Sequence, residues 1–590
     1  MRIFLSGLAL ALGLALPAFG APAVLGEPAL ATKAEPTPHL RLAPGSARRV
    51  ALPDIAEQAL AEIRELNRRS PAARGFEARP RRIVIGVMHG AHGAGLPGAA
   101  DLAWREVPGG HAAQLAVTSP QAESVRLAVE LAGVPTDVEM VFFGSANPSR
   151  LAGPVRVGDI VDRTAAWWGP ITEGETQTIE LFVPASHAPR ALPLRVADAS
   201  HIVTTPSSRF TKRLQDIGDA GSCNVDVPCS RLASDTAFRN AAESVAQMIF
   251  ADAGFMGLCT GTLLNDADPS SQVPYFFGAN HCFENDNPPY KTAAQMQAVA
   301  NTLTTLWGFE AAACNSTQPR SSWTQRSGGA AFLYNNVQAD ALLLRLNDTP
   351  PAGAFYSGWD ASTVSPGMPG LTIHHPQGDL KKVSEGTVQR LSVPSTGVGG
   401  GSVAFIEMRW SSGTTEGGSS GSGMFTPGGP QYLFRGGLWG GTALCEAPNG
   451  VDYYSRLDVV YPDIAQHLGS SSGNIDYTDL WWNPAESGWG LNLIQHPSRI
   501  IFGVWYTYGL DGKRTWFVMS GGQWTSANTY TGDVQRVAGP SYAVSPFDAS
   551  KVVRTSVGTA TLTFSDANNG TFSYTINGVS GSRAITRQPY

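Results

Sequence analysis

Residues 415–423 read Thr-Glu-Gly-Gly-Ser-Ser-Gly-Ser-Gly, and this glycine-rich stretch gives the strongest indication of the fold. Glycine allows a tight backbone turn, which can direct N–H groups toward a carbonyl oxygen. We expect the N–H groups of Gly418 and Ser420 to form such an oxyanion hole, with Ser420 as the nucleophile. A serine hydroxyl is weakly nucleophilic at neutral pH, so it needs a base within hydrogen-bond reach.

Two stretches earlier in the chain supply the partners of this serine. Residues 278–282 read Gly-Ala-Asn-His-Cys, and residues 339–346 place Asp340 just before an apolar run. An imidazole titrates near pH 6.5 and can take and return a proton, while an aspartate holds it in the required tautomer. The order His281, Asp340, Ser420 is that of the chymotrypsin-type triad and differs from the subtilisin and α/β-hydrolase orders.

Two other patterns in the same region have weaker support. Residues 417–421 match G-x-S-x-G with Ser419 as nucleophile, but that fold needs its histidine after the serine and a helix where glycine and proline stand at 427–430. The pair His374 and His375 is followed by proline and has no clustered carboxylate partner. We therefore expect a structural role for this pair, and neither a metal ion nor another cofactor.

Length and composition favour a multidomain β protein. The 590 residues correspond to about three or four domains at roughly 100–200 residues each. Only 15% of the residues are charged, and the 65 glycines and 41 prolines follow no Gly-X-Y period. Many turns and few long helices indicate β architecture. The net charge is −6 and no basic patch stands out, so we expect no nucleic-acid partner.

The N-terminus has the pattern of a signal peptide over residues 1–20. Arg2 precedes an apolar run over 3–16, and small residues follow up to Ala21. The apolar run is shorter than the roughly 20 residues that span a bilayer, and no later segment is long and apolar enough. We therefore predict a secreted protein without a membrane span.

All six cysteines lie between Cys223 and Cys445. An even number of cysteines in an exported chain predicts three disulfides, and six cysteines allow 15 pairings. Because the cysteines are confined to the middle of the chain, we expect that part to be a separate domain.

The region ahead of the first cysteine reads as a propeptide over residues 21–213, with a β-rich unit from about Arg82. Apolar runs between turn signals are typical of strands. The runs are residues 83–87, 113–117, 125–131, 138–143 and 178–183. They predict a β-sandwich-like unit over 82–205. The alternative is a permanent N-terminal binding domain.

Two polar stretches divide the rest of the chain. Residues 206–217 are polar and basic, which is typical of an exposed processing loop. The catalytic domain is predicted over 214–467, and the Gly/Ser-rich residues 468–474 form a linker. Residues 475–590 form a last β domain, with short strands between Asp-Gly and Asn-Gly turns.

The last domain is rich in tryptophan. Its six tryptophans are Trp481, Trp482, Trp489, Trp505, Trp516 and Trp524. The stretch over 481–490 resembles an aromatic module of exported bacterial proteins, to which we assign no firm function. The simpler interpretation makes these residues the core of a small β-barrel. The alternative is that exposed aromatic rings bind a polymer, such as a polysaccharide or a fibrous protein, or a cell surface.

Over residues 219–460 the chain resembles the bacterial lysyl endopeptidases, within the chymotrypsin-like serine proteases. The stretches that carry the resemblance are 221–229, 257–264, 281–282, 358–360, 373–376, 418–422 and 452–456. The resemblance implies a chymotrypsin-like double β-barrel. It also implies a secreted serine endopeptidase that cleaves proteins or peptides after lysine through an acyl-enzyme.

The resemblance also implies how the cysteines pair. The implied disulfides are Cys223–Cys445, Cys229–Cys314 and Cys259–Cys282. The third would tie a strand to the residue beside His281 and so fix the base. A native disulfide of this kind stabilises by about 2–5 kcal/mol.

The same resemblance implies a substrate pocket. Asp452 falls where lysyl endopeptidases carry the aspartate that receives the lysine ammonium, and a buried carboxylate selects a cation. Thr415 matches a polar residue of the pocket wall. Gly440 and Gly441 match the segment that pairs with the substrate backbone.

Two positions depart from the family pattern. Ala443 stands where a hydroxyl residue is expected in the pocket, and Trp439 replaces a histidine beside the active site. The choice between a lysine-specific enzyme and a trypsin-like enzyme that also accepts arginine therefore stays open. A non-enzymatic alternative is a catalytically dead, surface-binding relative, but the intact triad argues against it.

The residue before the nucleophile bears on activation. Many chymotrypsin-like zymogens carry an aspartate there, which pairs with a newly formed N-terminal ammonium, whereas this chain has Ser419. We therefore expect the propeptide to act as a folding aid and inhibitor. A lysine-specific enzyme would cut its own precursor after Lys212 and begin at Arg213, and a broader basic specificity would allow Leu214.

Overall fold

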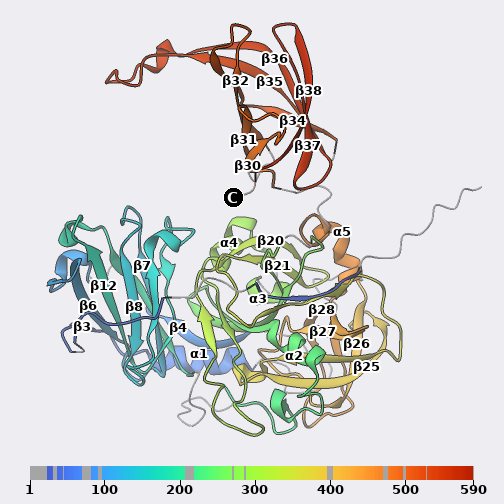
Figure 1. The fold of residues 1–590 in the computed structure, drawn as a ribbon. Helices are drawn as coiled ribbons and strands as arrows, with labels where there is room; N and C mark the ends of the chain where they lie inside the picture. The colour runs from blue at the N-terminus through green and yellow to red at the C-terminus, as the bar shows by residue number, and fades with distance from the viewer. Residues whose placement is uncertain are drawn as a thin grey trace, which may run out of the picture. The chain divides into compact units, whose positions relative to one another are not determined.

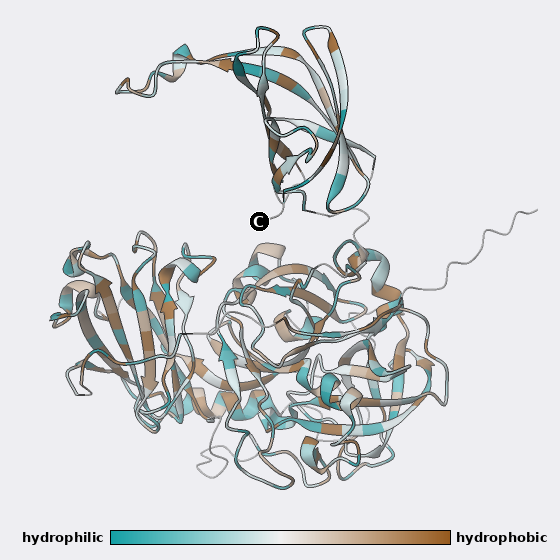
Figure 2. Cartoon of the chain, viewed as in Figure 1, coloured by the Kyte–Doolittle hydropathy of each residue, from teal (hydrophilic) through white to brown (hydrophobic). Residues whose placement is uncertain are grey.

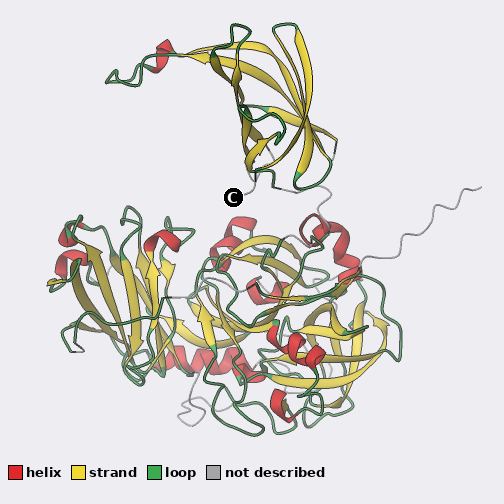
Figure 3. Cartoon of the chain, in the orientation of Figure 1, coloured by secondary structure: helices red, strands yellow, loops and turns green. Residues whose placement is uncertain are grey.

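The computed structural model describes most of the chain. The described residues are 23–30, 36–43, 45–68, 82–90, 96–205, 218–268, 271–284, 288–394, 403–469, 476–495, 500–526 and 528–588. They form a mainly β protein, as predicted (Figure 3), in two compact units over 1–468 and 469–590. The predicted signal peptide (1–20), the processing loop (206–217) and most of the linker (468–474) lie outside the described residues.

The first unit begins with a β-sandwich (Figure 1). One sheet has the order β3-β6-β12-β8-β9, with β5 beside β6, and the other has the order β10-β7-β13-β4, with β11 beside β7. The strands are β3 (Arg48–Ala51), β4 (Ile83–Met88), β5 (Arg105–Val107), β6 (Gly110–Thr118), β7 (Ser124–Glu130), β8 (Glu139–Gly144), β9 (Ala152–Arg156), β10 (Trp167–Trp168), β11 (Thr172–Glu173), β12 (Thr176–Pro184) and β13 (Arg195–Ile202). Leu115, Leu127 and Phe142 pack in the core between the sheets.

The β-rich region starts earlier than the predicted boundary near Arg82. Strand β3 joins the first sheet parallel to β6, with Val50 opposite Val117. Helix α1 (Glu57–Arg68) follows, and its buried Leu60 and Ile63 pack in the same cluster as Ile83 and Ile85 of β4. A four-residue strand with two arginines lacks the alternating apolar pattern, so the sequence gives little sign of it.

The sheet that contains β4 continues into the first barrel of the next domain. There the strand order is β19-β18-β15-β16-β17-β21-β20. The strands are β15 (Val245–Asp252), β16 (Phe255–Leu264), β17 (Tyr275–Gly278), β18 (Thr304–Trp307), β19 (Thr324–Arg326), β20 (Ala330–Asn336) and β21 (Ala341–Leu346). Met248, Phe276 and Leu344 are fully buried in its core.

The second barrel closes on itself through the pairing of β28 with β29, after the order β28-β27-β24-β25-β26-β29. Its strands are β24 (Pro369–His374), β25 (Lys382–Ser392), β26 (Phe405–Ser412), β27 (Gly423–Gly428), β28 (Gln431–Gly441) and β29 (Asp452–Tyr454), with β14 (Val225–Asp226) and β23 (Trp359–Asp360) as short additions, while β22 (Phe355–Tyr356) lies outside this sheet. Phe277 of the first barrel packs on Phe434 of the second, with ring centroids 5.0 Å apart. The two barrels thus share a core, and the predicted double barrel is present.

Helices contribute little to this domain. They are α2 (Thr236–Glu243), α3 (Asn280–Phe283), α4 (Ala293–Ala300) and α5 (Leu457–Leu468). Helix α5 includes Leu468, which the sequence analysis assigned to the linker. In the described part of the chain, no helix is both long and apolar enough to cross a membrane.

A short segment near the start of the chain contacts both barrels. Strand β1 (Ala23–Val24) pairs with β23, and β2 (Glu27–Pro28) pairs with β22. Between them, Gly26 exchanges two hydrogen bonds with the Gln431 side chain, at 2.7 and 2.9 Å. A Cβ on Gly26 would lie 2.4 Å from the Tyr356 carbonyl oxygen, so only glycine fits. We call residues 23–30 the N-terminal strap.

The second unit is a closed barrel in the order β33-β32-β31-β30-β38-β37-β36-β35, with β33 pairing with β35 and β34 added beside β35. Its strands are β30 (Asp479–Trp482), β31 (Gly490–Gln495), β32 (Ile501–Tyr508), β33 (Arg514–Met519), β34 (Gly522–Ser526), β35 (Thr529–Ala538), β36 (Val553–Phe564), β37 (Asn569–Ile576) and β38 (Val579–Arg587). Hydrophobic and hydrophilic residues are interspersed along these strands (Figure 2). Trp481 is fully buried in the barrel core, whereas Trp516 is 45% exposed.

We predict that the second unit unfolds separately, because it has its own core and no cysteine. Trp481→Ala should destabilise it by about 3–5 kcal/mol, the usual effect of removing a buried tryptophan. Scanning calorimetry of the full chain should show one transition shifted and the transition of the first unit unchanged. The exposed Trp516→Ala is the matched control and should change stability by less than about 0.5 kcal/mol. An equal shift of both transitions would contradict separate unfolding.

Candidate active site

The loop that carries Ser420 joins β26 to β27 in the second barrel. Gly418 and Gly421 both have φ of 84°, which favours glycine. A Cβ on Gly418 would lie 2.9 Å from the His375 carbonyl oxygen and 3.0 Å from Leu258 Cδ2, so the loop packs too closely for any side chain there. The glycines that the sequence analysis emphasised are therefore required by both conformation and packing.

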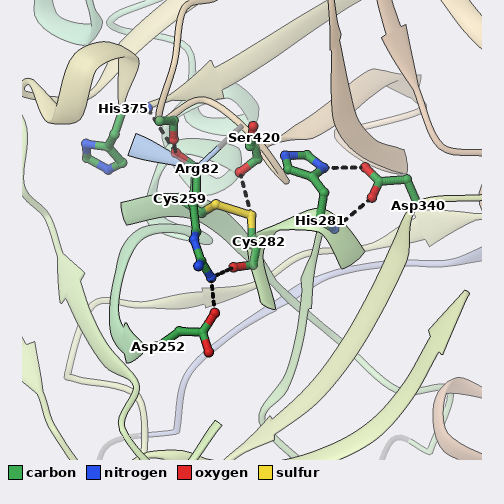
Figure 4. Close-up of a disulfide and its surroundings, with 10 residues drawn as sticks. Arg82, Asp252, Cys259, His281, Cys282, Asp340, His375 and Ser420 are labelled. Carbon is green, nitrogen blue, oxygen red and sulfur yellow. Dashed lines mark hydrogen bonds and ion pairs between the residues drawn. A yellow bond between two sulfur atoms is a disulfide. The ribbon is translucent and has the colours of Figure 1, made fainter. Parts of the chain in front are cut away.

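Strand β16 of the first barrel holds this loop through Thr260. The Thr260 N–H donates to the Ser420 carbonyl oxygen at 2.9 Å, and its hydroxyl donates to the Gly418 carbonyl oxygen at 2.8 Å. Cys259, the preceding residue, is joined by a disulfide to Cys282 of α3 (Figure 4). These contacts connect the loop of Ser420 to the helix of His281.

Asp340 fixes the orientation of His281. Its Oδ2 accepts a hydrogen bond from His281 Nδ1 at 2.8 Å, and its Oδ1 accepts one from the His281 backbone N–H at 2.9 Å. The Asp340 side chain is 2% exposed and that of His281 is 11% exposed. The pairing of β17 with β21 brings the two residues together, because α3 follows β17 and Asp340 precedes β21.

The other ring nitrogen of His281 faces Ser420 (Figure 4). His281 Nε2 is buried and has no hydrogen-bond partner among the described residues. In the same part of the chain, no acceptor pairs with the N–H of Gly418 or Ser420. The site thus combines a hydroxyl, an oriented imidazole and two free backbone donors, which is the set needed for nucleophilic attack on a carbonyl carbon.

Ser419 points into a buried polar network instead of the site. Its Oγ lies 2.8 Å from His374 Nδ1 and accepts from the Glu416 N–H at 3.2 Å. His374 Nε2 lies 3.2 Å from Ser384 Oγ, which donates to the Thr414 carbonyl oxygen at 2.7 Å. Burial lowers the pKa of His374 to about 3, so the ring is neutral at physiological pH. A neutral ring with its proton on Nε2 satisfies every member of this network.

His375 also has a structural setting. It is fully buried, its Nδ1 lies 3.0 Å from the Asp379 carbonyl oxygen, and its ring stacks on Phe309 at 6.0 Å. Burial lowers its pKa well below the usual value. Both histidines of the pair therefore serve packing and loop geometry.

Asp452 is a buried carboxylate in the second barrel, 1% exposed. Its Oδ2 accepts hydrogen bonds from Trp410 Nε1 at 2.6 Å and from Thr415 Oγ1 at 2.7 Å. Burial raises the pKa of Asp452 to about 6, although these hydrogen bonds and one from the Ala443 N–H act in the opposite direction. Among the described residues no cation pairs with this carboxylate.

The backbone beside Asp452 is shaped by glycine. Gly440 and Gly441, at the end of β28, pair with Tyr453 and Asp452 of β29. A Cβ on Gly441 would lie 2.3 Å from Asp452 Oδ1, so a side chain there would displace the carboxylate. Trp439, the departure from the family pattern, is 5% exposed and packs against Tyr453 at 5.9 Å.

Sequence reasoning missed three residues of the site. They are Trp410, which donates to Asp452; Thr260, which holds the nucleophile loop; and Ser384, which completes the His374 network. Trp410 lies two residues beyond Met408, the partner of Asp452 across the β26–β29 ladder. Such contacts depend on strand register, for which the local sequence carries no signal.

The six cysteines form the disulfides Cys223–Cys445, Cys229–Cys314 and Cys259–Cys282. These are the three pairs that the family resemblance implies. The first ties the start of the domain to the region just after β28. The second ties the start of the domain to the segment that follows β18.

Comparison with known families identifies both large parts of the first unit. Residues 35–203 match the model for the lysyl endopeptidase N-terminal domain, and residues 217–455 match the model for the lysyl endopeptidase C-terminal domain. A lysyl endopeptidase of Pseudomonas aeruginosa is 36% identical over 381 residues, which covers 62% of this chain and 77% of that protein.

The solved structures that match are much less similar to this chain. The MamO protease domain from Magnetospirillum magneticum is 12% identical with a TM-score of 0.26, over 38% of this chain and 97% of that chain. The active form of the Rv3671c protease from M. tuberculosis is 15% identical with a TM-score of 0.27, over 44% of this chain and 92% of that chain.

We predict that Ser419→Ala destabilises the first unit by about 1–3 kcal/mol, because it leaves His374 Nδ1 and the Glu416 N–H without their buried partner. Urea unfolding followed by fluorescence measures the change. Ser411→Ala, at an exposed position on β26, is the matched control and should stay within about 0.5 kcal/mol of the parent. Equal effects of the two substitutions would show that the buried network contributes nothing specific.

Proposed function

Because the chain belongs to the lysyl endopeptidase family of serine endopeptidases, we propose that it hydrolyses peptide bonds after lysine through an acyl-enzyme formed on Ser420. The observation that carries the proposal is the double hydrogen bond between Asp340 and His281, which leaves the free nitrogen of the imidazole facing Ser420. The proposal has two parts, a reaction and a specificity, and each rests on a different group of residues.

The reaction follows from the roles that these groups can take. His281 Nε2 removes the proton of Ser420 as its Oγ attacks the carbonyl carbon, and Asp340 stabilises the imidazolium that forms. The N–H groups of Gly418 and Ser420 donate to the developing oxyanion. His281 then protonates the leaving amine, and a water molecule activated by the same imidazole hydrolyses the acyl-enzyme.

The specificity follows from the buried carboxylate of Asp452. Burying an ionised carboxylate without a cation costs free energy. Burial therefore favours the protonated form of Asp452 and raises its pKa. A lysine side chain that enters the pocket would supply the cation and favour the ionised form. Trp410 and Thr415 both donate to Oδ2 and so fix the orientation of the carboxylate that would accept the ammonium.

The surrounding parts of the chain have proposed roles of their own. We propose export through the signal peptide, in keeping with three disulfides that form in oxidising compartments. The N-terminal domain is proposed to assist folding and to inhibit the enzyme before maturation. For the C-terminal barrel, the cross-strand pair Tyr506 and Trp516, 52% and 45% exposed, supports binding of a polymer or cell surface.

We predict that Ser420→Ala abolishes peptidase activity and leaves the precursor full length apart from its signal peptide. The wild-type chain should cut itself after Lys212, so that N-terminal sequencing begins at Arg213, or at Leu214 if arginine is also accepted. A fluorophosphonate probe should label the wild type and not the variant. Processing of the Ser420→Ala chain at the same bond, with no other protease present, would exclude self-maturation.

We predict that Asp452→Asn lowers kcat/KM for a lysyl peptide roughly 30- to 5,000-fold, the equivalent of about 2–5 kcal/mol for a lost buried charge pair. An ester with an uncharged side chain should lose much less. The exposed Asp463→Asn in α5 is the matched control and should change neither rate. An unchanged lysine preference in Asp452→Asn would place the selecting carboxylate elsewhere.

The pH dependence of the same pocket is a separate prediction. The folded pKa of Asp452 is raised to about 6, so the free enzyme has a neutral pocket below this pH and a charged one above it. kcat/KM for lysyl substrates should therefore rise through about pH 6 more steeply than for uncharged esters, because only the former need the ionised pocket. The difference between the two profiles should disappear in Asp452→Asn, and its persistence there would contradict the assignment.

A further inference from the structure

Strand β4 of the N-terminal domain pairs with the part of β16 that leads to the active site. Ile83 lies opposite Leu258 and Val84 opposite Gly257 in an antiparallel ladder. Leu258 contacts the nucleophile loop, since its Cδ2 would lie 3.0 Å from a Cβ on Gly418. The ladder thus ends two residues before Thr260, which binds the Ser420 carbonyl oxygen.

Arg82 extends this contact to the residue beside the base. Its Nη1 donates to Asp252 Oδ2 at 2.5 Å and to the Cys282 carbonyl oxygen at 3.1 Å, and Cys282 directly follows His281. Figure 4 shows the Arg82 side chain beside the Cys259–Cys282 disulfide, with its guanidinium directed toward Asp252 and Cys282. The guanidinium is therefore linked to the helix of His281 through the Cys282 carbonyl oxygen.

The enzyme domain has room for this arginine because residue 257 is glycine. A Cβ on Gly257 would lie 3.1 Å from Arg82 Cδ and 2.6 Å from the Phe250 ring. Asp252 is a strong partner for the cation, since its side chain is 8% exposed and also binds Lys291 at 2.7 Å. The enzyme domain thus provides a recess, a carboxylate and a carbonyl oxygen for the side chain of Arg82.

Without β4, this half of β16 would be an unpaired strand edge. On its other side β16 pairs with β15, and β17 reaches only Thr262–Leu264. An exposed edge beside a nucleophile is a place where an extended peptide adds as another strand. With the lysine in the pocket at Asp452 of the second barrel, we infer that the half of a substrate beyond the cleaved bond runs toward the first barrel, where this edge lies.

We propose that β4 and Arg82 form an autoinhibitory strand, which occupies the leaving-group side of the active site in the manner of an extended peptide. The proposal rests on the proposed function and specifies the regulation of that site. Among the described residues between 36 and 205, none forms a hydrogen bond or ion pair with Asp452, Thr415 or Trp410. The described part of this domain therefore covers the leaving-group side without contacting the pocket residues, so we expect it to exclude chiefly substrates that extend past the cleaved bond.

The test uses the full chain with Lys212→Ala and Arg213→Ala, which removes the predicted processing sites. Two substrates are compared: a lysine methyl ester, whose leaving group is methanol, and a peptide with four residues after the same lysine. The parent should hydrolyse the ester and cleave the peptide poorly. Arg82→Ala should raise peptide cleavage at least tenfold and ester hydrolysis less than threefold.

Two further variants make the result specific. Asp252→Asn removes the partner of Arg82 from the enzyme side and should produce the same selective rise. Arg195→Ala is the control, because Arg195 forms an exposed ion pair with Glu130 within the sandwich and should change neither rate. A parent that handles both substrates alike, or an equal rise for both in Arg82→Ala, would overturn the proposal.

The proposed function itself can fail separately. If no variant hydrolyses either substrate and a fluorophosphonate does not label Ser420, the assignment of the reaction is wrong. If the ester is hydrolysed but peptide cleavage is unchanged by both Arg82→Ala and Asp252→Asn, the reaction stands and the autoinhibitory strand is excluded.

Discussion

The two hydrogen bonds that His281 donates to Asp340 constrain the rest of the catalytic arrangement. One carboxylate oxygen binds the imidazole and the other binds the backbone of the same residue, so both the ring and its helix are fixed. A single aspartate achieves this because β17 and β21 are neighbours. The end of β17, which leads to His281, lies beside the start of β21, which follows Asp340. The direction in which the free Nε2 points, and therefore its position relative to Ser420, depends on that fixed ring.

The second constraint is how the nucleophile loop is held between two barrels. Thr260 of the first barrel forms hydrogen bonds to the loop. The neutral His374 of the second barrel forms a hydrogen bond to Ser419 of the same loop. In a buried environment a charged group at Ser419 would need a compensating cation, whereas the hydroxyl needs only hydrogen bonds. The loop is thus positioned by neutral polar contacts that exist before any cleavage of the chain, which fits the expectation that an N-terminal ammonium does not switch this enzyme on.

Local patterns were enough to predict five strands of the N-terminal domain and the candidate triad. The five apolar runs of the N-terminal region all fall in strands, and the glycines around Ser420 have the conformations that their spacing indicated. Trp410, Ser384 and Arg82 escaped notice because their roles depend on which strands pair and in what register. The C-terminal tryptophans show the same limit, since Trp481 is buried and Trp516 is exposed although both lie in strands of the same barrel.

The N-terminal strap changes what cleavage of the chain can accomplish. Residues 23–30 bind both barrels, and β4 binds the first, so both attachments precede the predicted processing loop in the chain. Cutting the loop removes the covalent link but leaves two tethered contacts, each of which holds the other at a high effective concentration. The N-terminal domain then dissociates only when both contacts break together. Release from the proposed inhibition would therefore depend on the rate of dissociation and on dilution, and not only on cleavage of the peptide bond. Such an enzyme would stay inhibited while its concentration is high and become active once it is diluted.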